Sequence, residues 1–215
     1  MIFRLEKILR DVRVALDMND QPDALLPESD TDTLTLEQLI ASKVTEAVRR
    51  VHMAAPTRLL EYGHNFGEEI QHHTATGGWI LLPDDFMRLV SFRMSDWTRA
   101  LDEAAEAGSV SYKRQRSEYG GIRGSATKPA CSLTMRPEGL ALEYHGCRSA
   151  EAYVAEGVYM PLPTIDADGG VDISRECYRA VVYMTAALVQ TSFGDGEKAK
   201  TNYEMVNTLL NTTGQ

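Results

Sequence analysis

Apolar residues recur at helical spacing near the beginning of the chain. From Ile2 to Leu16 the apolar positions fall on one side of a helix, with charged residues opposite. A second such run extends from Leu36 to Val51. Thr35, just before this run, and Gln38, three residues later, have the spacing of a capping box, which indicates the start of a helix. Pro56 predicts that this helix ends near Ala55. Helices of these lengths are marginal alone in water, so both apolar stripes must pack against other elements.

Two more helices are predicted near the C-terminal end of the chain. The residues from Arg175 to Ser192 are apolar around most of a helix circumference, which is typical of a helix in the middle of a bundle. Ser174 is placed to cap this helix. Gly194 and Gly196 break it, and an amphipathic helix follows from Glu197. The pair predicts an αα-hairpin.

The centre of the chain carries strand patterns. After Pro83 and two acidic residues, which favour the start of a short helix, the positions from Val90 to Trp97 alternate as in a half-buried strand. Ala130–Met135 and Leu140–Tyr144 flank a turn and predict a β-hairpin. A third strand is expected at Ala152–Met160.

Two loop-rich segments separate these elements. Met18 to Thr33 is polar and contains two prolines, which favours a loop. Arg58 to Gly78 contains four glycines and little periodicity, so we expect a loop-rich crossing with one short strand around Ile80.

These elements predict an α+β fold that is mainly α. The N- and C-terminal helices, about residues 1–61 and 172–211, would form a helical bundle. A small mixed or β-rich insertion, about residues 79–161, would project from it. We expect a single domain over residues 1–215, a length that allows a sizeable core.

Composition narrows the classes of function. The chain has 31 acidic and 22 basic residues, a formal charge of −9, which disfavours sequence-independent binding to duplex DNA. Its three cysteines, Cys131, Cys147 and Cys177, lack CxxC spacing and signal neither a disulfide framework nor a zinc cluster. The longest apolar run, Ala180–Val189, is about half the length of a membrane span. Nothing in the sequence indicates export or membrane insertion.

No familiar catalytic motif is present. The sequence has no GxSxG, Walker, HExxH or GxGxxG pattern. The residues nearest to a metal cluster are His64, His72 and His73, with two glutamates between them. Adjacent side chains of a strand or helix point in different directions, so a solvated loop is favoured over a metal site. Asp84 and Asp85 could form a catalytic pair, yet their place after Pro83 favours the start of a helix. We predict no catalytic, cofactor-binding or metal-binding residues.

One basic segment stands out in this acidic chain. Between Ser111 and Lys128 there are five basic residues and one acid, with two tyrosines interleaved. A solvated loop, an interface with an acidic neighbour, including another copy of the chain, and contact with nucleic acid are all open. We favour a subunit interface. The basic residues assigned to it are Lys113, Arg114, Arg116 and Arg123.

Four segments, in this order, resemble the head-to-tail connector (adaptor) proteins of tailed bacteriophages. The most characteristic is the run LPDDF (residues 82–86) with Arg88, which leads into an apolar strand closing on Trp97. The others are the N-terminal helix with Leu36–Leu60 and its VHMAAP ending, the strand region Lys128–Pro161, and the helix Tyr178–Phe193 followed by GDGEKAK. Together they span most of the chain.

The resemblance implies a structural virion protein without enzymatic activity or cofactor. Adaptors of this kind form a ring, usually of twelve copies, beneath the portal protein, extend the DNA channel and give the next tail component a platform. DNA would be passing cargo only, and a negative charge suits a lumen through which DNA slides. The protein would be in the host cytoplasm during assembly and then at the head-to-tail interface of the virion. By the same analogy the last helix, with Leu209 and Leu210, would contact the portal.

The alternative is a small-molecule-binding protein or an enzyme whose site is assembled from residues distant in sequence. Such a site would show a deep polar pocket and strongly shifted pKa values, whereas an adaptor would expose large interface patches.

Overall fold

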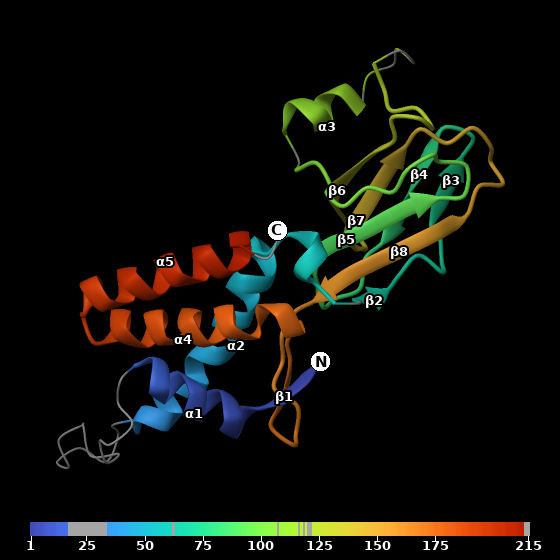
Figure 1. Cartoon of the computed structure of the whole chain (residues 1–215). Helices are drawn as coiled ribbons and strands as arrows, with labels where there is room; N and C mark the ends of the chain where they lie inside the picture. Colours follow the sequence, from blue (N-terminus) through green and yellow to red (C-terminus); the bar gives the residue numbers. More distant parts are fainter. Residues whose placement is uncertain are drawn as a thin grey trace. The chain divides into compact units, whose positions relative to one another are not determined.

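The chain forms two compact units (Figure 1). The computed structural model describes residues 1–16, 34–61, 63–106, 108–115, 117, 119 and 122–212. The helical unit comprises Met1–Glu61 and Pro163–Gln215, and the β unit comprises Tyr62–Leu162. The loop predicted at Met18–Thr33 and Arg116 of the basic segment lie outside the described residues.

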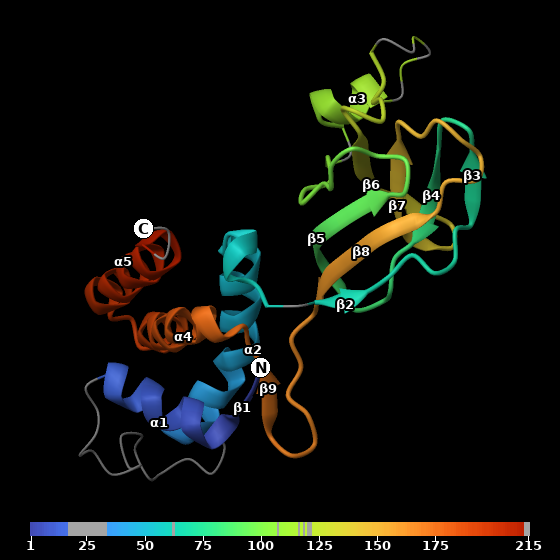
Figure 2. The ribbon, with the colours of Figure 1, turned by 45° about the vertical axis from the view of Figure 1, so that its right-hand side comes forward.

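The helical unit is built on four helices and one pair of strands. The helices are α1 (Leu5–Ala15), α2 (Leu36–Ala54), α4 (Tyr178–Ser192) and α5 (Gly196–Thr212), with 3-10 turns at Thr57–Leu59 and Arg175–Cys177. Strand β1 (Ile2–Arg4) pairs antiparallel with β9 (Gly170–Asp172), and Figure 2 shows this pair beside α1. The first residues of the run at Ile2 are therefore a strand, and the helix begins at Leu5.

Helix α4 lies at the centre of this unit, as its pattern predicts. It packs against α1, α2 and α5, and ten of its residues are buried. The capping box of α2 is also confirmed, because the Thr35 side chain accepts from the Gln38 N–H and the Gln38 side chain accepts from the Thr35 N–H. Ser174 does not cap α4 with its side chain. Its Oγ instead accepts from the Glu61 N–H at 3.1 Å.

The β unit contains seven strands among its described residues. They are β2 (His64–Asn65), β3 (His72–Thr74), β4 (Gly77–Leu81), β5 (Phe86–Met94), β6 (Ala130–Arg136), β7 (Gly139–His145) and β8 (Val154–Pro161). One antiparallel sheet has the order β2-β8-β5 and the other β3-β4-β7-β6. A short helix, α3 (Val110–Gln115), adjoins β6.

The apolar residues between the two sheets form the core of the β unit. Phe92 of β5 lies 5.7 Å from Tyr144 of β7 and 5.4 Å from Trp97, ring centre to ring centre. Residues from both sheets belong to one buried cluster, including Phe66, Ile80, Leu89, Phe92, Met94, Trp97, Leu142, Tyr144 and Tyr159. Alternation along each strand therefore leaves every second side chain of β4, β7 and β6 on the outer face of the four-stranded sheet.

The predicted fold class is wrong. The chain is 39% helical and 28% strand, with antiparallel sheets of two, three and four strands, and is a mixed α/β fold instead of a mainly α bundle. The helix expected after Pro83 is absent, because strand pairing with β8 begins already at Phe86. The predicted hairpin and third strand are present, but the third strand, β8, pairs with β5 in the other sheet.

Candidate functional site

The histidine-rich segment does not assemble a metal site. His72 and His73 are neighbours in β3, and the His73 ring contacts the Tyr144 hydroxyl at 2.8 Å while His72 lies on the outer face of the sheet. His64 lies in β2 with its ring 5.8 Å from that of Tyr159. Within the described residues no group of three potential ligands comes together.

Asp84 and Asp85 have different environments. Asp84 is exposed in the turn before β5, whereas Asp85 accepts a hydrogen bond from the Tyr159 hydroxyl at 2.8 Å. Burial, and then the neighbouring Asp85, raise the pKa of Tyr159 to about 12. The tyrosine is therefore protonated at neutral pH, and its bond to Asp85 ties the start of β5 to β8.

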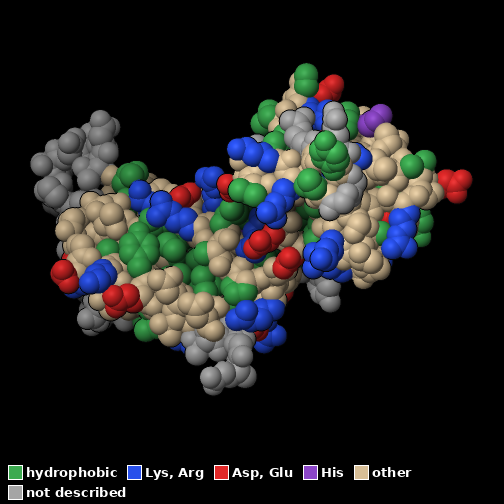
Figure 3. Space-filling model, turned by 90° about the horizontal axis from the view of Figure 1, so that it is seen from above, with side chains coloured by type: hydrophobic (Ala, Val, Ile, Leu, Met, Phe, Trp, Pro, Cys, Tyr) green, Lys and Arg blue, Asp and Glu red, His purple; other side chains and the backbone are tan. Residues whose placement is uncertain are grey.

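The basic segment begins in α3. Gln115 is buried, and its Nε2 donates to the backbone oxygen of Cys131 in β6 at 3.5 Å. Lys113 and Arg114 are exposed on the same helix, and Arg123 is half-buried in the following turn. Figure 3 shows Lys and Arg side chains distributed over the face of the β unit that it presents. The segment thus has an anchored side and a basic exposed side.

The end of α5 divides into buried and exposed positions. Leu210 is only 5% exposed and belongs to the core of the helical unit, and Leu209 packs partly against that core. Asn207 and Asn211 are exposed. A partner that binds α5 without unfolding it would contact exposed polar residues such as Asn207 and Asn211, and not the buried side chain of Leu210.

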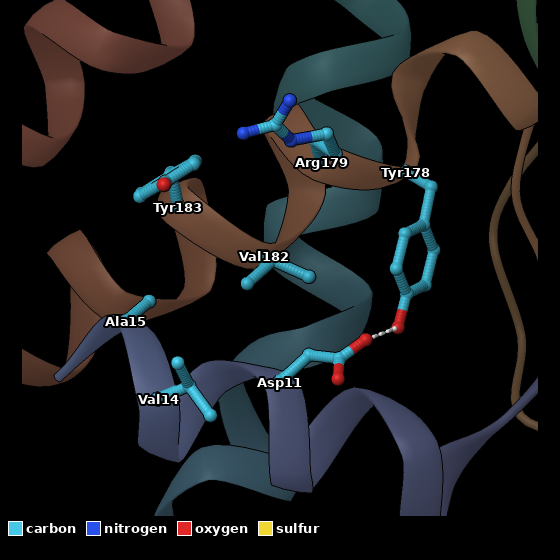
Figure 4. Close-up of a pocket in the computed structure, with 7 residues that line it drawn as sticks. All are labelled: Asp11, Val14, Ala15, Tyr178, Arg179, Val182 and Tyr183. Carbon is cyan, nitrogen blue, oxygen red and sulfur yellow. Dashed lines mark hydrogen bonds between the residues drawn. The ribbon is translucent and has the colours of Figure 1, made fainter. Parts of the chain in front are cut away.

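A pocket of about 400 Å³ lies between α1 and α4 (Figure 4). Asp11, Val14 and Ala15 of α1 face Val182 of α4, and Tyr178 lies at one end, where its hydroxyl donates to Asp11.

At the polar end of this pocket, the side chains of Lys7, Asp11 and Tyr178 interact with one another. Lys7 donates to Asp11 at 2.8 Å, and its Nζ lies 4.0 Å from the centre of the Tyr178 ring. Burial opposes ionisation of Asp11, but the hydrogen bonds from Lys7 and Tyr178 outweigh it and lower the pKa of the carboxyl. Burial, followed by the bond to Asp11, raises the pKa of Tyr178. Neither group is suited to proton transfer near neutral pH, so the network holds α1 on α4.

A second pocket, of about 450 Å³, lies on the outer face of the four-stranded sheet; we call it the outer pocket. Trp79 and Glu143 are paired across β4 and β7, and the Arg136 guanidinium carbon lies 4.4 Å from the centre of the Trp79 ring. Gly77 and His145, which are paired across the same two strands, also line the pocket. The remaining lining residues are His72, Thr74, Thr76, Gly78 and Arg123.

Sequence reasoning singled out Arg123 as an interface residue and His72 as a rejected metal ligand, but it did not predict the outer pocket. Alternation along the observed strands places Ser132, Thr134 and Arg136 on one face of β6 and Glu143 and His145 on the same face of β7. The predicted strands were shorter and left Arg136 in the turn and His145 outside the hairpin, so they indicated only Ser132, Thr134 and Glu143. Trp79 could not be found, since the pairing of β4 with β7 joins segments distant in sequence.

The three cysteines are buried in different environments. Burial is the main cause that raises the pKa of Cys131 and of Cys147 to about 12 and that of Cys177 to about 11. The thiols are therefore protonated at neutral pH and poor nucleophiles.

Comparison with known proteins adds no relative. The sequence matches no protein-family model and no curated protein. In the described residues no helix combines the length and apolar character that a membrane crossing requires.

Proposed function

We propose that the chain is a head-to-tail adaptor of a tailed bacteriophage, a structural subunit that binds the portal protein as a ring. The observation that carries the proposal is the ordered resemblance of four segments, from the N-terminal helices through LPDDF to GDGEKAK. These segments contribute to both units, and LPDDF leads into β5, the longest strand of the three-stranded sheet.

Surface chemistry supports an assembling protein. Large apolar side chains are exposed on both units, including Val14 and Met53 on the helical unit and Val110, Met135 and Tyr153 on the β unit. Figure 3 shows apolar side chains gathered over the middle of the helical unit. Apolar patches bordered by charged residues are typical of protein interfaces.

Small-molecule binding is the second candidate, because the pocket between α1 and α4 is large enough for a ligand. Asp11 and Tyr178 of its lining are bonded to each other, and Asp11 also to Lys7, so Arg179 and Tyr183 are the polar side chains of the lining outside this network. The adaptor remains the first proposal because the ordered resemblance of the four segments supports it.

The deciding experiment is co-sedimentation of the purified chain with the portal oligomer encoded near it, at two salt concentrations. Saturable binding at about one chain per portal subunit is expected. A folded chain that fails to bind at either salt concentration would refute the proposal and direct attention to ligand screening.

Variants can then locate the two contacts. Charge reversal at Lys113 and Arg114 should weaken assembly of the ring, while reversal at Arg58 and Arg175, which are exposed on the helical unit, serves as the matched control. For portal contact, Asn207→Arg and Asn211→Arg change exposed positions of α5 without disturbing Leu210. Portal binding unaffected by the latter pair would exclude this face of α5.

A further inference from the structure

Among the acids that the structure describes, none pairs with Arg136 of the outer pocket. Its guanidinium lies over Trp79, and within the described residues it forms no ion pair. Its Nε and the Glu143 Oε2 are buried atoms with no hydrogen-bond partner in that part of the chain. Stacking on an aromatic ring orients a guanidinium and leaves its N–H groups for a planar oxyanion.

The outer pocket is positive in a negative protein. Its lining contains Arg123 and Arg136 against a single described acid, Glu143, whose Oε1 already lies 3.6 Å from His145 Nε2. Carboxylates are therefore the groups that this pocket is best suited to hold.

The chain itself contains a complementary segment. Residues 17–33 include six acids (Asp17, Asp20, Asp23, Glu28, Asp30 and Asp32) and no Lys or Arg. Subtracting this −6 from the formal charge of −9 leaves −3 for the rest of the chain. Most of the net negative charge is thus concentrated in one short run, whose sequence also includes the apolar residues Leu25 and Leu26.

We propose that the outer pocket binds the acidic segment 17–33 of a second copy, with carboxylates of the segment on Arg123 and Arg136. Such a contact joins two different surfaces of identical chains, and head-to-tail contacts of this kind form a ring when the rotation between neighbours closes. The choice of a second copy as the source of the segment rests on the proposed ring; the recognition of carboxylates rests on the pocket alone.

Peptide binding tests the pocket. The host is the full chain with its own six acids in 17–33 changed to the corresponding amides, and the probe is a fluorescent peptide of residues 17–33. Saturable binding that weakens with added salt is expected. Arg123→Gln with Arg136→Gln should weaken it about tenfold, whereas the matched pair Arg99→Gln and Arg148→Gln, exposed on the β unit outside the pocket lining, should change it less than about twofold.

Thermal melting of each variant checks that it is folded, so that a loss of binding is not mistaken for unfolding. If the double pocket variant is not folded, Arg123→Gln alone, in the half-buried turn, is the measurement and should still weaken binding about threefold. Absence of peptide binding, equal losses in the pocket and control variants, or equal binding of the peptide with all six acids amidated would overturn the proposal.

Complementation tests the second copy. One chain carries the pocket substitutions and the other carries the amidated segment, so neither can form the contact with itself. Their equimolar mixture should form a heterodimer in sedimentation velocity while each alone stays monomeric. A monomeric mixture despite peptide binding would show that the segment is not exchanged between copies. Because these measurements need no portal, they can succeed or fail independently of the co-sedimentation experiment.

Discussion

The Asn202 Nδ2 donates a hydrogen bond of 2.8 Å to the Gln190 Oε1, and both side chains are buried. The bond joins α5 to α4 inside the αα-hairpin. Apolar side chains could fill both positions, so the amide pair adds a directional contact that fixes how the two helices meet.

Asn202→Ala should destabilise the helical unit by about 2 kcal/mol, because it leaves the Gln190 oxygen buried without a donor. Replacing both residues with leucine should cost less than the single change, since no polar group is then left unpaired. Chemical denaturation followed by circular dichroism measures both. If the double leucine variant is less stable than Asn202→Ala, the amide pair contributes more to stability than the satisfaction of its own hydrogen-bonding groups.

Gly78 is required by close packing between strands. A Cβ at this position would overlap the backbone oxygen of His72 and crowd the Tyr144 hydroxyl. We expect Gly78→Ala to destabilise the β unit by about 2 kcal/mol. Gly196→Ala is the control, because a Cβ at Gly196, the first residue of α5, would meet no atom within 4 Å. That change should be neutral or stabilising by about 0.5 kcal/mol, and equal destabilisation by both would contradict the packing argument.

The helices could be predicted because their signals are local. Thr35, Gln38 and Pro56 specify both ends of α2 within its own sequence, and the apolar circumference of α4 indicates its central position. The break at Gly194 is equally local, since this residue adopts a φ of +79°.

The sheets depended on contacts that no local pattern contains. Pro83, Asp84 and Asp85 are good residues for a helix start, but the pairing of Phe86 with Pro161 makes the following segment a strand. The short strands at His64 and His72 were missed because their stability comes from β8 and β4. The outer pocket was missed with them, since Trp79 meets Arg136 only after three strands have paired.

Tyr159 should ionise far above its ordinary pKa, near pH 12, because it is buried and donates to Asp85. A group whose pKa is raised on folding stabilises the fold below its unfolded pKa, about 10, and this contribution is lost as the pH rises towards 12. Asp85→Asn should lower the pKa of Tyr159 by removing the adjacent negative charge. Tyrosinate absorbance during an alkaline titration, with Tyr159→Phe to assign the transition, measures the change; an unchanged titration in Asp85→Asn would contradict the assignment.

The lowered pKa of Asp11 predicts how the stability of the helical unit changes at acidic pH. Its pKa is lowered from the ordinary value of 3.8 because, although burial opposes ionisation, the hydrogen bonds from Lys7 and Tyr178 outweigh it. The stabilisation is therefore present above that ordinary value and is lost as the pH falls through the lower folded pKa. Asp11→Asn should reduce stability at neutral pH and flatten its decline in acid, whereas Glu6→Gln, an exposed change on the same helix, should leave the profile unaltered.

Thermal melting from pH 7 down to pH 2 measures this difference, and added salt separates its two sources. Salt should reduce the contribution of the exposed ion pair between Lys7 and Asp11 more than that of the hydrogen bond from Tyr178. Tyr178→Phe should therefore keep the salt-sensitive stabilisation from the Lys7–Asp11 ion pair and lose the stabilisation from the Tyr178 hydrogen bond. If Asp11→Asn and the unaltered chain show parallel pH profiles, the Asp11 network does not control the attachment of α1 to α4.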